Sequence, residues 1–332
     1  MFNSAFNNDY LVSSSSYAEV MNQSVLPFLQ EKEQNCSVSG FENKPIYCVS
    51  YQADKPVGTV FIVHGFTENA MKYAELIFSL LHHHYSVVAY DQRGHGRSWR
   101  SEAVPDSSIT HVDHFSDYVS DFQSVCDHYK SIMPEPWFLF AHSMGGAVAS
   151  LYLEEHPGVF TAAVLSSPMI APNVHGVPYA FAAGLASVAR LLHKDRKQPF
   201  FMKTYSGPED FKTSCATDQN RFNWYDSIKY SHKEFRNSVP SYRWSVEAIK
   251  VTKEILRPNA PEKIACPVLL CSADCDDSVL HAPQEQFIHR VPKGVYLFVP
   301  DSKHEIYRSV NNVLFPWWHQ VLEFLTSNLS HS

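Results

Sequence analysis

The most informative segment for the fold is FLFAHSMGGAVASLYLEEHPG (residues 138–158), because its hydrophobic pattern changes at one serine. A short apolar run typical of a buried strand ends before Ser143, and a helical pattern follows it. Small residues stand two positions before and two positions after the serine, at Ala141 and Gly145. This is the pattern of the G-x-S-x-G elbow, with alanine in place of the first glycine. The alternative is that Ser143 serves as an ordinary helix N-cap.

The rest of the chain alternates short apolar runs with longer segments of helical periodicity. The expected buried strands are 58–65, 85–91, 137–143, 162–168, 267–273 and 294–300. The expected helices are 69–84, an amphipathic segment across 115–129, and 310–329. Strands that are apolar on both faces and alternate with helices predict an α/β fold, with a mostly parallel central sheet covered by helices on both faces.

One segment interrupts this alternation. Residues 171–255 contain no clean strand, and loops between sheet strands are usually far shorter. We expect this segment to be a helical cap, with an apolar helix at 178–192 as a wall for an apolar ligand. The predicted organisation is therefore a first core part at 1–170, whose residues 1–40 form a peripheral N-terminal segment, the cap at 171–255, and a second core part at 256–332.

An elbow serine needs a general base and an acid to become a nucleophile. His304 follows the last expected strand, in the segment FVPDSKHEIYRS (298–309). The segment PVLLCSADCDDSV (267–279) supplies the acid after the preceding strand, and we prefer Asp276 while Asp274 and Asp277 remain alternatives. The order serine, acid, histidine is that of an α/β-hydrolase, so Ser143, Asp276 and His304 form the predicted triad.

An oxyanion hole requires two N–H donors near the serine. We assign them to the backbone N–H groups of Met144, directly after the serine, and of Phe66, in the loop after an early strand. The alternative for the neighbouring His64 and Gly65 is a plain strand-to-helix turn. The segment YDQRGHGRSWR (90–100) lacks the lysine and spacing of a P-loop, so we interpret it as a tight glycine turn.

Composition excludes several classes of protein. The net charge of −7 and the absence of a basic stripe argue against a nucleic-acid partner. The seven cysteines are scattered and odd in number, which favours reduced thiols over a disulfide framework or a zinc site. The N-terminus has no secretory signal pattern, and no transmembrane segment is expected. We expect a cytoplasmic protein with no metal, no organic cofactor and no obligate protein partner.

Four segments together resemble the α/β-hydrolase superfamily, and within it bacterial lysophospholipases of the L-two type, which are similar to monoglyceride lipases. These segments are HGFTENAMKYAEL (64–76), YDQRGHGRS (90–98), AHSMGGAVASLYLEEHPGVFTAAVLSSPM (141–169) and KHEIYRS (303–309); PSYRW (240–244) adds to the match. The resemblance spans about residues 55–320.

The resemblance implies hydrolysis of the single acyl ester of a lysophospholipid, with transacylation to a second lipid as a further activity. It gives the roles of nucleophile, acid and base to Ser143, Asp276 and His304. A monoacylglycerol lipase or a general carboxylesterase is the alternative, and a non-catalytic ligand-binding member of the fold is a more distant one. A peripheral contact of the cap with the inner membrane is a further hypothesis.

Overall fold

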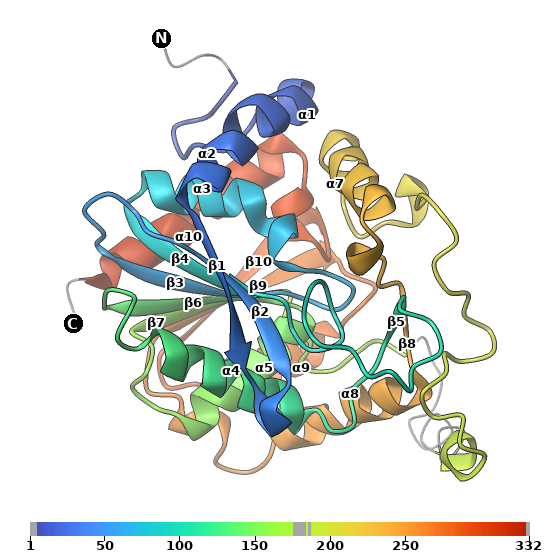
Figure 1. The fold of residues 1–332 in the computed structure, drawn as a ribbon. Coiled ribbons are helices and arrows are strands. Elements are labelled where there is room, and N and C mark those ends of the chain that lie inside the picture. The colour runs from blue at the N-terminus through green and yellow to red at the C-terminus, as the bar shows by residue number, and fades with distance from the viewer. Residues whose placement is uncertain (1–4, 175–183, 185–186, 330–332) are drawn as a thin grey trace.

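The computed structural model describes residues 5–174, 184 and 187–329. Its centre is an eight-stranded sheet with the order β1-β2-β4-β3-β6-β7-β9-β10 (Figure 1). These strands are β1 (Glu33–Ser39), β2 (Pro45–Tyr51), β3 (Gly58–Val63), β4 (Tyr85–Tyr90), β6 (Trp137–His142), β7 (Ala162–Ser166), β9 (Val268–Cys275) and β10 (Gly294–Lys303). The strands from β4 to β10 pair in parallel, whereas β1 and β2 pair antiparallel.

All six strands expected from the apolar runs are present in this sheet. Every residue of β3, β4, β6 and β7 is buried, because helices cover both faces of the central strands. The mostly parallel α/β fold predicted from the sequence is therefore confirmed.

Helices pack on both faces of the sheet and enclose two separate hydrophobic clusters (Figure 1). One face carries α4 (Ser116–Tyr129), α5 (Met144–Glu155), α8 (Tyr242–Ile255) and α9 (His281–Ile288). The cluster on the other face includes residues of α1 (Tyr17–Val20), α2 (Leu26–Lys32), α3 (Ala74–His82), α7 (Gln219–Ser231) and α10 (Asn311–Ser327). Shorter helical turns are η1 (Ser14–Ser16), η2 (Met21–Val25), η3 (Phe41–Asn43), η4 (Ala70–Tyr73), η5 (Phe211–Thr213), η6 (Lys233–Phe235), η7 (Pro261–Lys263) and η8 (Ile306–Arg308).

The N-terminal segment, which we expect to be peripheral, supplies the edge strand β1 and helical residues that pack against the core. Strand β1 is the first strand of the sheet, and α1, η2 and α2 lie on one sheet face. Tyr17, Met21, Val25 and Leu29 are buried at intervals of four residues, so one side of this helical stretch packs against the core. A helix can pack against the core through a single apolar stripe, so the polar residues on its other side do not prevent this packing.

The expected cap contains helices where the structure describes it. These include residues 187–191, α7 and α8, and a two-residue strand β8 (Val239–Pro240) that pairs with β5 (Ile109–Thr110). Most of the apolar helix expected at 178–192 lies outside the described residues. The domain boundaries at 170/171 and 255/256 stay a prediction.

A buried arginine joins this region to the N-terminal segment. Arg221 on α7 is 1% exposed, pairs with Glu75 at 3.1 Å and Asp218 at 3.3 Å, and donates to the carbonyl of Val12 at 2.6 Å. A buried charge is tolerated only when it is paired and hydrogen-bonded in this way. Within the described ranges, no helix is both long enough and apolar enough to cross a bilayer.

Candidate active site

Ser143 occupies a strained turn between β6 and α5. Its backbone angles are φ 50° and ψ −118°, a conformation that a residue with a side chain rarely adopts. The surrounding chain holds this turn: the Ser143 N–H donates to the Ser166 carbonyl at 3.1 Å, and the Ser143 carbonyl accepts from the Met169 N–H at 2.8 Å. A plain N-cap would not need a left-handed φ, so the geometry matches the nucleophile elbow.

Gly145 is required because α5 begins against the end of β3. A Cβ at this position would lie only 2.2 Å from the Val63 carbonyl oxygen. Ala141, on the other side of the serine, is fully buried. The small residues at positions 141 and 145 therefore fit the close packing around the serine turn. The backbone nearest to Gly145 belongs to β3, and not to β6, the strand that precedes the serine.

The three residues of the predicted triad lie in one hydrogen-bonded chain. His304 Nε2 lies 2.8 Å from Ser143 Oγ, and His304 Nδ1 lies 2.7 Å from Asp276 Oδ2. An ionised carboxylate only accepts hydrogen bonds, so Nδ1 carries the proton and Nε2 is free to accept the serine proton. Asp276 follows β9 and His304 follows β10, which brings both to the sheet edge where β6 ends.

Asp276 contacts the histidine, whereas the two alternative acids do not. Oδ1 of Asp276 accepts from the N–H groups of Ser278 at 2.9 Å and Val279 at 3.1 Å, which fixes the carboxylate. Asp274 instead accepts from the N–H of Asp301 at 3.2 Å. Asp277 is exposed.

The pair is enclosed, and each partner shifts the pKa of the other. The side chain of Asp276 is fully buried, and His304 is 6% exposed. Burial alone would lower the pKa of His304, but the charge and hydrogen bond of Asp276 outweigh it and raise that pKa. Burial would raise the pKa of Asp276, and the His304 imidazolium with the amide hydrogen bonds lowers it instead. The arrangement therefore stabilises the protonated histidine.

A second histidine lies behind the first. The rings of His142 and His304 have centroids 4.8 Å apart, and His142 Nδ1–H donates to the Ser166 carbonyl at 3.0 Å. Burial lowers the pKa of His142 to about 4. His142 is therefore neutral at physiological pH and does not repel a protonated His304.

Sequence reasoning missed a buried carboxylate beside the triad. Glu68 accepts four hydrogen bonds, from the Gly65 N–H at 2.6 Å, Tyr73 OH at 2.6 Å, Tyr307 OH at 2.5 Å and Lys72 Nζ at 2.9 Å. Burial would raise the pKa of Glu68, but the Lys72 charge and these donors hold it well below its usual range.

Lys72 extends this cluster to the loop that carries the histidine. Its Nζ also contacts Glu305 at 2.6 Å, directly after His304, and Glu305 pairs with Arg308 at 2.6 Å. The cluster of Glu68, Lys72, Glu305 and Arg308 thus ties the loop after β3 to the loop after β10. The spacing of four between Glu68 and Lys72 was the only sequence signal for it.

The two proposed oxyanion donors come from different elements: Met144 from the start of α5, and Phe66 from the loop after β3. Met144 is the first residue of α5, and the first N–H groups of a helix have no partner within the helix. Phe66 is half-buried, and its ring packs on Trp244 of α8 with centroids 4.2 Å apart. The PSYRW segment of the expected cap therefore supports the loop that carries Phe66.

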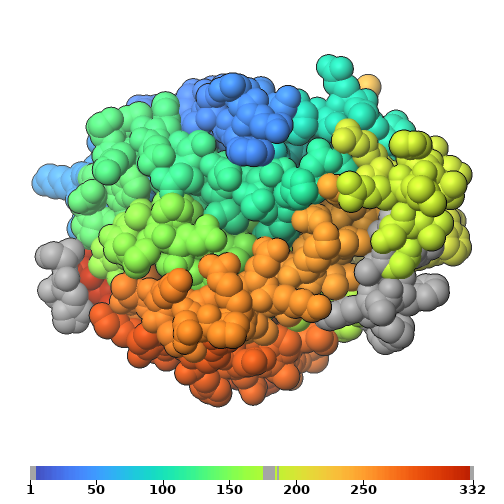
Figure 2. Space-filling view, turned by 90° about the horizontal axis from the view of Figure 1, so that it is seen from below, coloured from blue at the N-terminus to red at the C-terminus, as the bar shows by residue number. Residues whose placement is uncertain are grey.

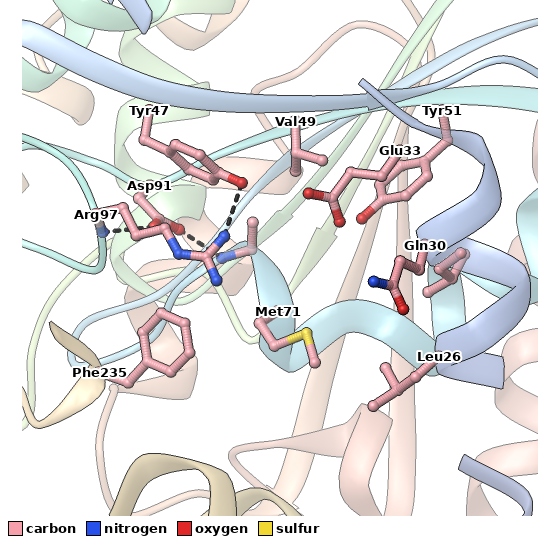
Figure 3. A pocket seen from close by; sticks show the side chains of 12 residues that line it. Leu26, Gln30, Glu33, Tyr47, Val49, Tyr51, Met71, Asp91, Arg97 and Phe235 are labelled. Carbon is pink, nitrogen blue, oxygen red and sulfur yellow. Dashed lines mark hydrogen bonds between the residues drawn. The ribbon is translucent and has the colours of Figure 1, made fainter. Parts of the chain in front are cut away.

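Asp91 and Arg97, from the segment after β4, help to line a separate pocket of about 320 Å³ (Figure 3). Arg97 lies between the rings of Tyr47 and Phe235, at 5.0 and 5.5 Å from their centroids, and donates to Tyr47 OH at 2.8 Å. Asp91 accepts from the N–H groups of Ala70 and Arg97, both at 2.8 Å. Among the described residues that line this pocket, none belongs to the predicted triad. The hydrogen bonds of Asp91 and Arg97 hold the segment after β4 against Ala70 and Tyr47.

With this geometry in place, comparison with known proteins gives the family. The family described as serine aminopeptidase, S33 (Hydrolase_4) matches residues 54–309. The chain belongs to this family. The resemblance to α/β-hydrolases found in the sequence is therefore confirmed.

Three relatives carry lipase or phospholipase names, and two of them align over most of the chain. "Lysophospholipase L2" of Escherichia coli is 26% identical over 98% of this chain and 96% of its own length. "Probable lysophospholipase L2" of Haemophilus influenzae is 25% identical over 87% of this chain and 90% of its own. Human "Monoglyceride lipase" is 37% identical, over 36% of this chain and 39% of its own.

Solved structures confirm the fold. The monoacylglycerol lipase of Paleococcus ferrophilus superposes with a TM-score of 0.65 at 21% identity, and the match covers 86% of this chain and 99% of that one. A soluble variant of the Saccharomyces cerevisiae monoglyceride lipase gives a TM-score of 0.67 at 18% identity, over 89% and 96% of the two chains. The family and the relatives together indicate a hydrolase of the lipase or esterase type.

Proposed function

We propose that this protein is a serine hydrolase that cleaves the acyl ester of a lysophospholipid. The observation that carries the proposal is the hydrogen-bonded chain from Ser143 through His304 to Asp276. The substrate class is supported by the relatives named lysophospholipase L2, which align over nearly the whole chain.

The proposed reaction proceeds in two acyl transfers. Ser143 Oγ bonds to the ester carbonyl carbon while its proton passes to His304 Nε2. His304 then returns this proton to the glycerol oxygen as the carbon–oxygen bond breaks, which leaves an acyl ester on Ser143. Water repeats both steps and releases the fatty acid, and Asp276 stabilises the imidazolium each time.

The negative charge of each tetrahedral intermediate falls on the former carbonyl oxygen. We propose that this oxygen accepts hydrogen bonds from the backbone N–H groups of Phe66 and Met144. Loss of one such donor typically costs roughly 10²–10³ in rate. Besides the substrate and water, these steps use only the chain's own side chains and backbone amides.

Monoacylglycerol hydrolysis is the second candidate function, because the human monoglyceride lipase shares 37% identity over part of the chain. A substrate panel separates the two. Fatty-acid release from lysophosphatidylcholine, monoolein and p-nitrophenyl butyrate is compared, with Ser143→Ala protein as the blank. The proposal predicts the highest kcat/KM for the lysophospholipid, and a preference for either of the others overturns it. Adding a second lipid as acyl acceptor to the same assay tests transacylation.

We further propose that the expected cap touches a lipid surface. Large apolar side chains are exposed along one segment: Val188, Leu191, Leu192, Phe200 and Phe201. Exposed cations lie among them: Arg190, Lys194, Lys197 and Lys203. This yellow-green segment forms one side of the molecule in Figure 2. An apolar stretch flanked by Lys and Arg is typical of binding to anionic membrane interfaces.

Flotation with vesicles of anionic phospholipid tests this contact. Wild-type protein is expected to float with the vesicles, and a Leu191→Glu/Phe200→Glu variant is expected to remain at the bottom. Ile132→Glu, which changes an apolar residue that is 50% exposed outside the segment, is the matched control. Equal flotation of all three proteins, or no flotation of wild type, overturns the proposal.

A further inference from the structure

Two cysteines face each other across the antiparallel hairpin at the edge of the sheet. Cys36 on β1 and Cys48 on β2 are register partners, so their side chains lie on the same sheet face. Antiparallel partners have Cα atoms about 4.5–5.5 Å apart. This separation falls within the roughly 4.4–6.8 Å that a disulfide spans. The hairpin backbone is thus compatible with a bond between the two sulfurs.

The two thiols differ in access and surroundings. Cys48 is fully buried, whereas Cys36 is half-buried and reachable from solvent. Helix α4 brings two polar groups to the Cys36 sulfur: His128 Nε2 at 3.7 Å and Tyr129 OH at 3.5 Å. One accessible thiol therefore lies between a buried thiol and two potential hydrogen-bond donors.

These contacts favour the thiolate form at Cys36 and the protonated form at Cys48. The neighbouring Cys48 thiol, the Tyr129 hydroxyl and the nearby His128 lower the pKa of Cys36 despite its partial burial. The same contact with Cys36, together with burial, raises the pKa of Cys48 well above its usual value. Cys36 is thus the nucleophilic partner and Cys48 the partner that keeps its proton.

We propose that Cys36 and Cys48 form a peroxide-oxidised thiol pair that closes to a disulfide across the hairpin. The Cys36 sulfur attacks one oxygen of a hydroperoxide and becomes a sulfenic acid, and the other oxygen leaves as hydroxide or alkoxide and takes up a proton. The Cys48 sulfur then bonds to the Cys36 sulfur as the sulfur–oxygen bond of the sulfenic acid breaks, and the hydroxyl group leaves as water with the proton of the Cys48 thiol. The two sulfurs lose two electrons in total, and the peroxide gains them. The proposal does not depend on the ester hydrolysis.

The remaining cysteines serve as internal references. Burial raises the pKa values of Cys126, Cys215, Cys266 and Cys271, with Cys215 and Cys271 each reaching about 12 and Cys266 about 11. Cys275 is exposed, so its oxidation rate measures the effect of solvent access alone. Faster oxidation of Cys36 than of Cys275 would reflect the contacts around Cys36 rather than its exposure.

The experiment is a titration of the folded full-length protein with hydrogen peroxide at neutral pH. Unreacted thiols are alkylated, oxidised ones are then reduced and alkylated with a heavier reagent, and each cysteine is quantified by peptide mass spectrometry. We expect Cys36 and Cys48 to oxidise together, roughly tenfold faster than Cys275, because the thiolate is the reactive form. A peptide pair joined through Cys36 and Cys48 should appear and should vanish on reduction.

Two variants separate the steps of the reaction. Cys48→Ala should leave Cys36 as a sulfenic acid that dimedone traps, and Cys36→Ser should leave Cys48 unoxidised at the same peroxide dose. Cys275→Ser is the matched control and should not change the joined peptide. The proposal is overturned if wild-type Cys36 oxidises no faster than Cys275, or if no Cys36–Cys48 link forms. Both of these results come from wild-type protein, so they do not depend on the folding of any variant.

Discussion

The backbone N–H of Gly65 donates to Oε2 of Glu68 at 2.6 Å, and this bond anchors the loop that carries the proposed Phe66 donor. Glu68 is itself held by Tyr73, Tyr307 and Lys72. The position of the Phe66 N–H therefore depends on a carboxylate that we do not expect to touch the substrate. Glu68 is a positioning residue in this account.

Glu68→Gln keeps the side-chain size but removes the charge and replaces one acceptor oxygen by a donor. We expect kcat to fall about 10–100-fold with little change in KM, somewhat less than the loss of an oxyanion donor itself. Steady-state kinetics with p-nitrophenyl butyrate measure both values. The exposed Glu42→Gln is the control. A folded Glu68→Gln protein with unchanged kcat would contradict this role.

Asp276→Asn tests the choice of acid. We expect kcat to fall roughly 10⁴-fold, because the amide no longer holds the histidine in the productive tautomer. Asp277→Asn, one position along the same loop and exposed, should keep near-native activity. The reverse outcome for the two variants would show that the acid is wrongly assigned.

The pH dependence of kcat/KM measures the pKa of the general base, His304. His304 acts in its neutral form, and its pKa is raised above the ordinary value of 6.5 by Asp276. Activity should therefore fall as the pH decreases, through a single acid limb with its midpoint above 6.5. His142, with a pKa of about 4, should add no limb near neutrality. A midpoint clearly below 6.5 would mean that Asp276 does not support the histidine.

Arg221→Met tests what holds α7 to the core. The change leaves Glu75 and Asp218 buried without their cation, so we expect a loss of about 3–5 kcal/mol in the free energy of unfolding. Urea denaturation measures this loss. Arg190→Met, which changes an exposed arginine, should stay within about 0.5 kcal/mol of wild type. Equal free energies of unfolding for the two variants would contradict the claim that Arg221 holds α7 to the core.

The sequence predicted the central strands because they are buried on both faces and so appear as unbroken apolar runs. Strand β1, EQNCSVS, was missed because its outward side is polar and only Val38 is fully buried. The N-terminal helical stretch was missed because its apolar residues form one stripe among polar residues. Both elements lie at the edge of the fold, where apolar runs are weakest.

The triad candidates could be located because each follows a recognisable strand, and the parallel sheet brings strand ends together. The Glu68 cluster could not be located in this way, because the identity of a charged residue does not show whether it is buried or exposed to solvent. Its partners come from distant parts of the chain: Tyr307 and Glu305 lie more than 230 positions from Glu68 and Lys72. Only the folded chain reveals these contacts.

Trapping the acyl-enzyme tests the central proposal most directly. Wild-type protein is mixed with a lysophospholipid, quenched in acid during turnover, and digested for peptide mass spectrometry. The proposed mechanism predicts the fatty acyl group as an ester on Ser143, and neither acyl ester nor turnover in the Ser143→Ala protein. An acyl group on another residue, or turnover that survives in Ser143→Ala, would contradict it.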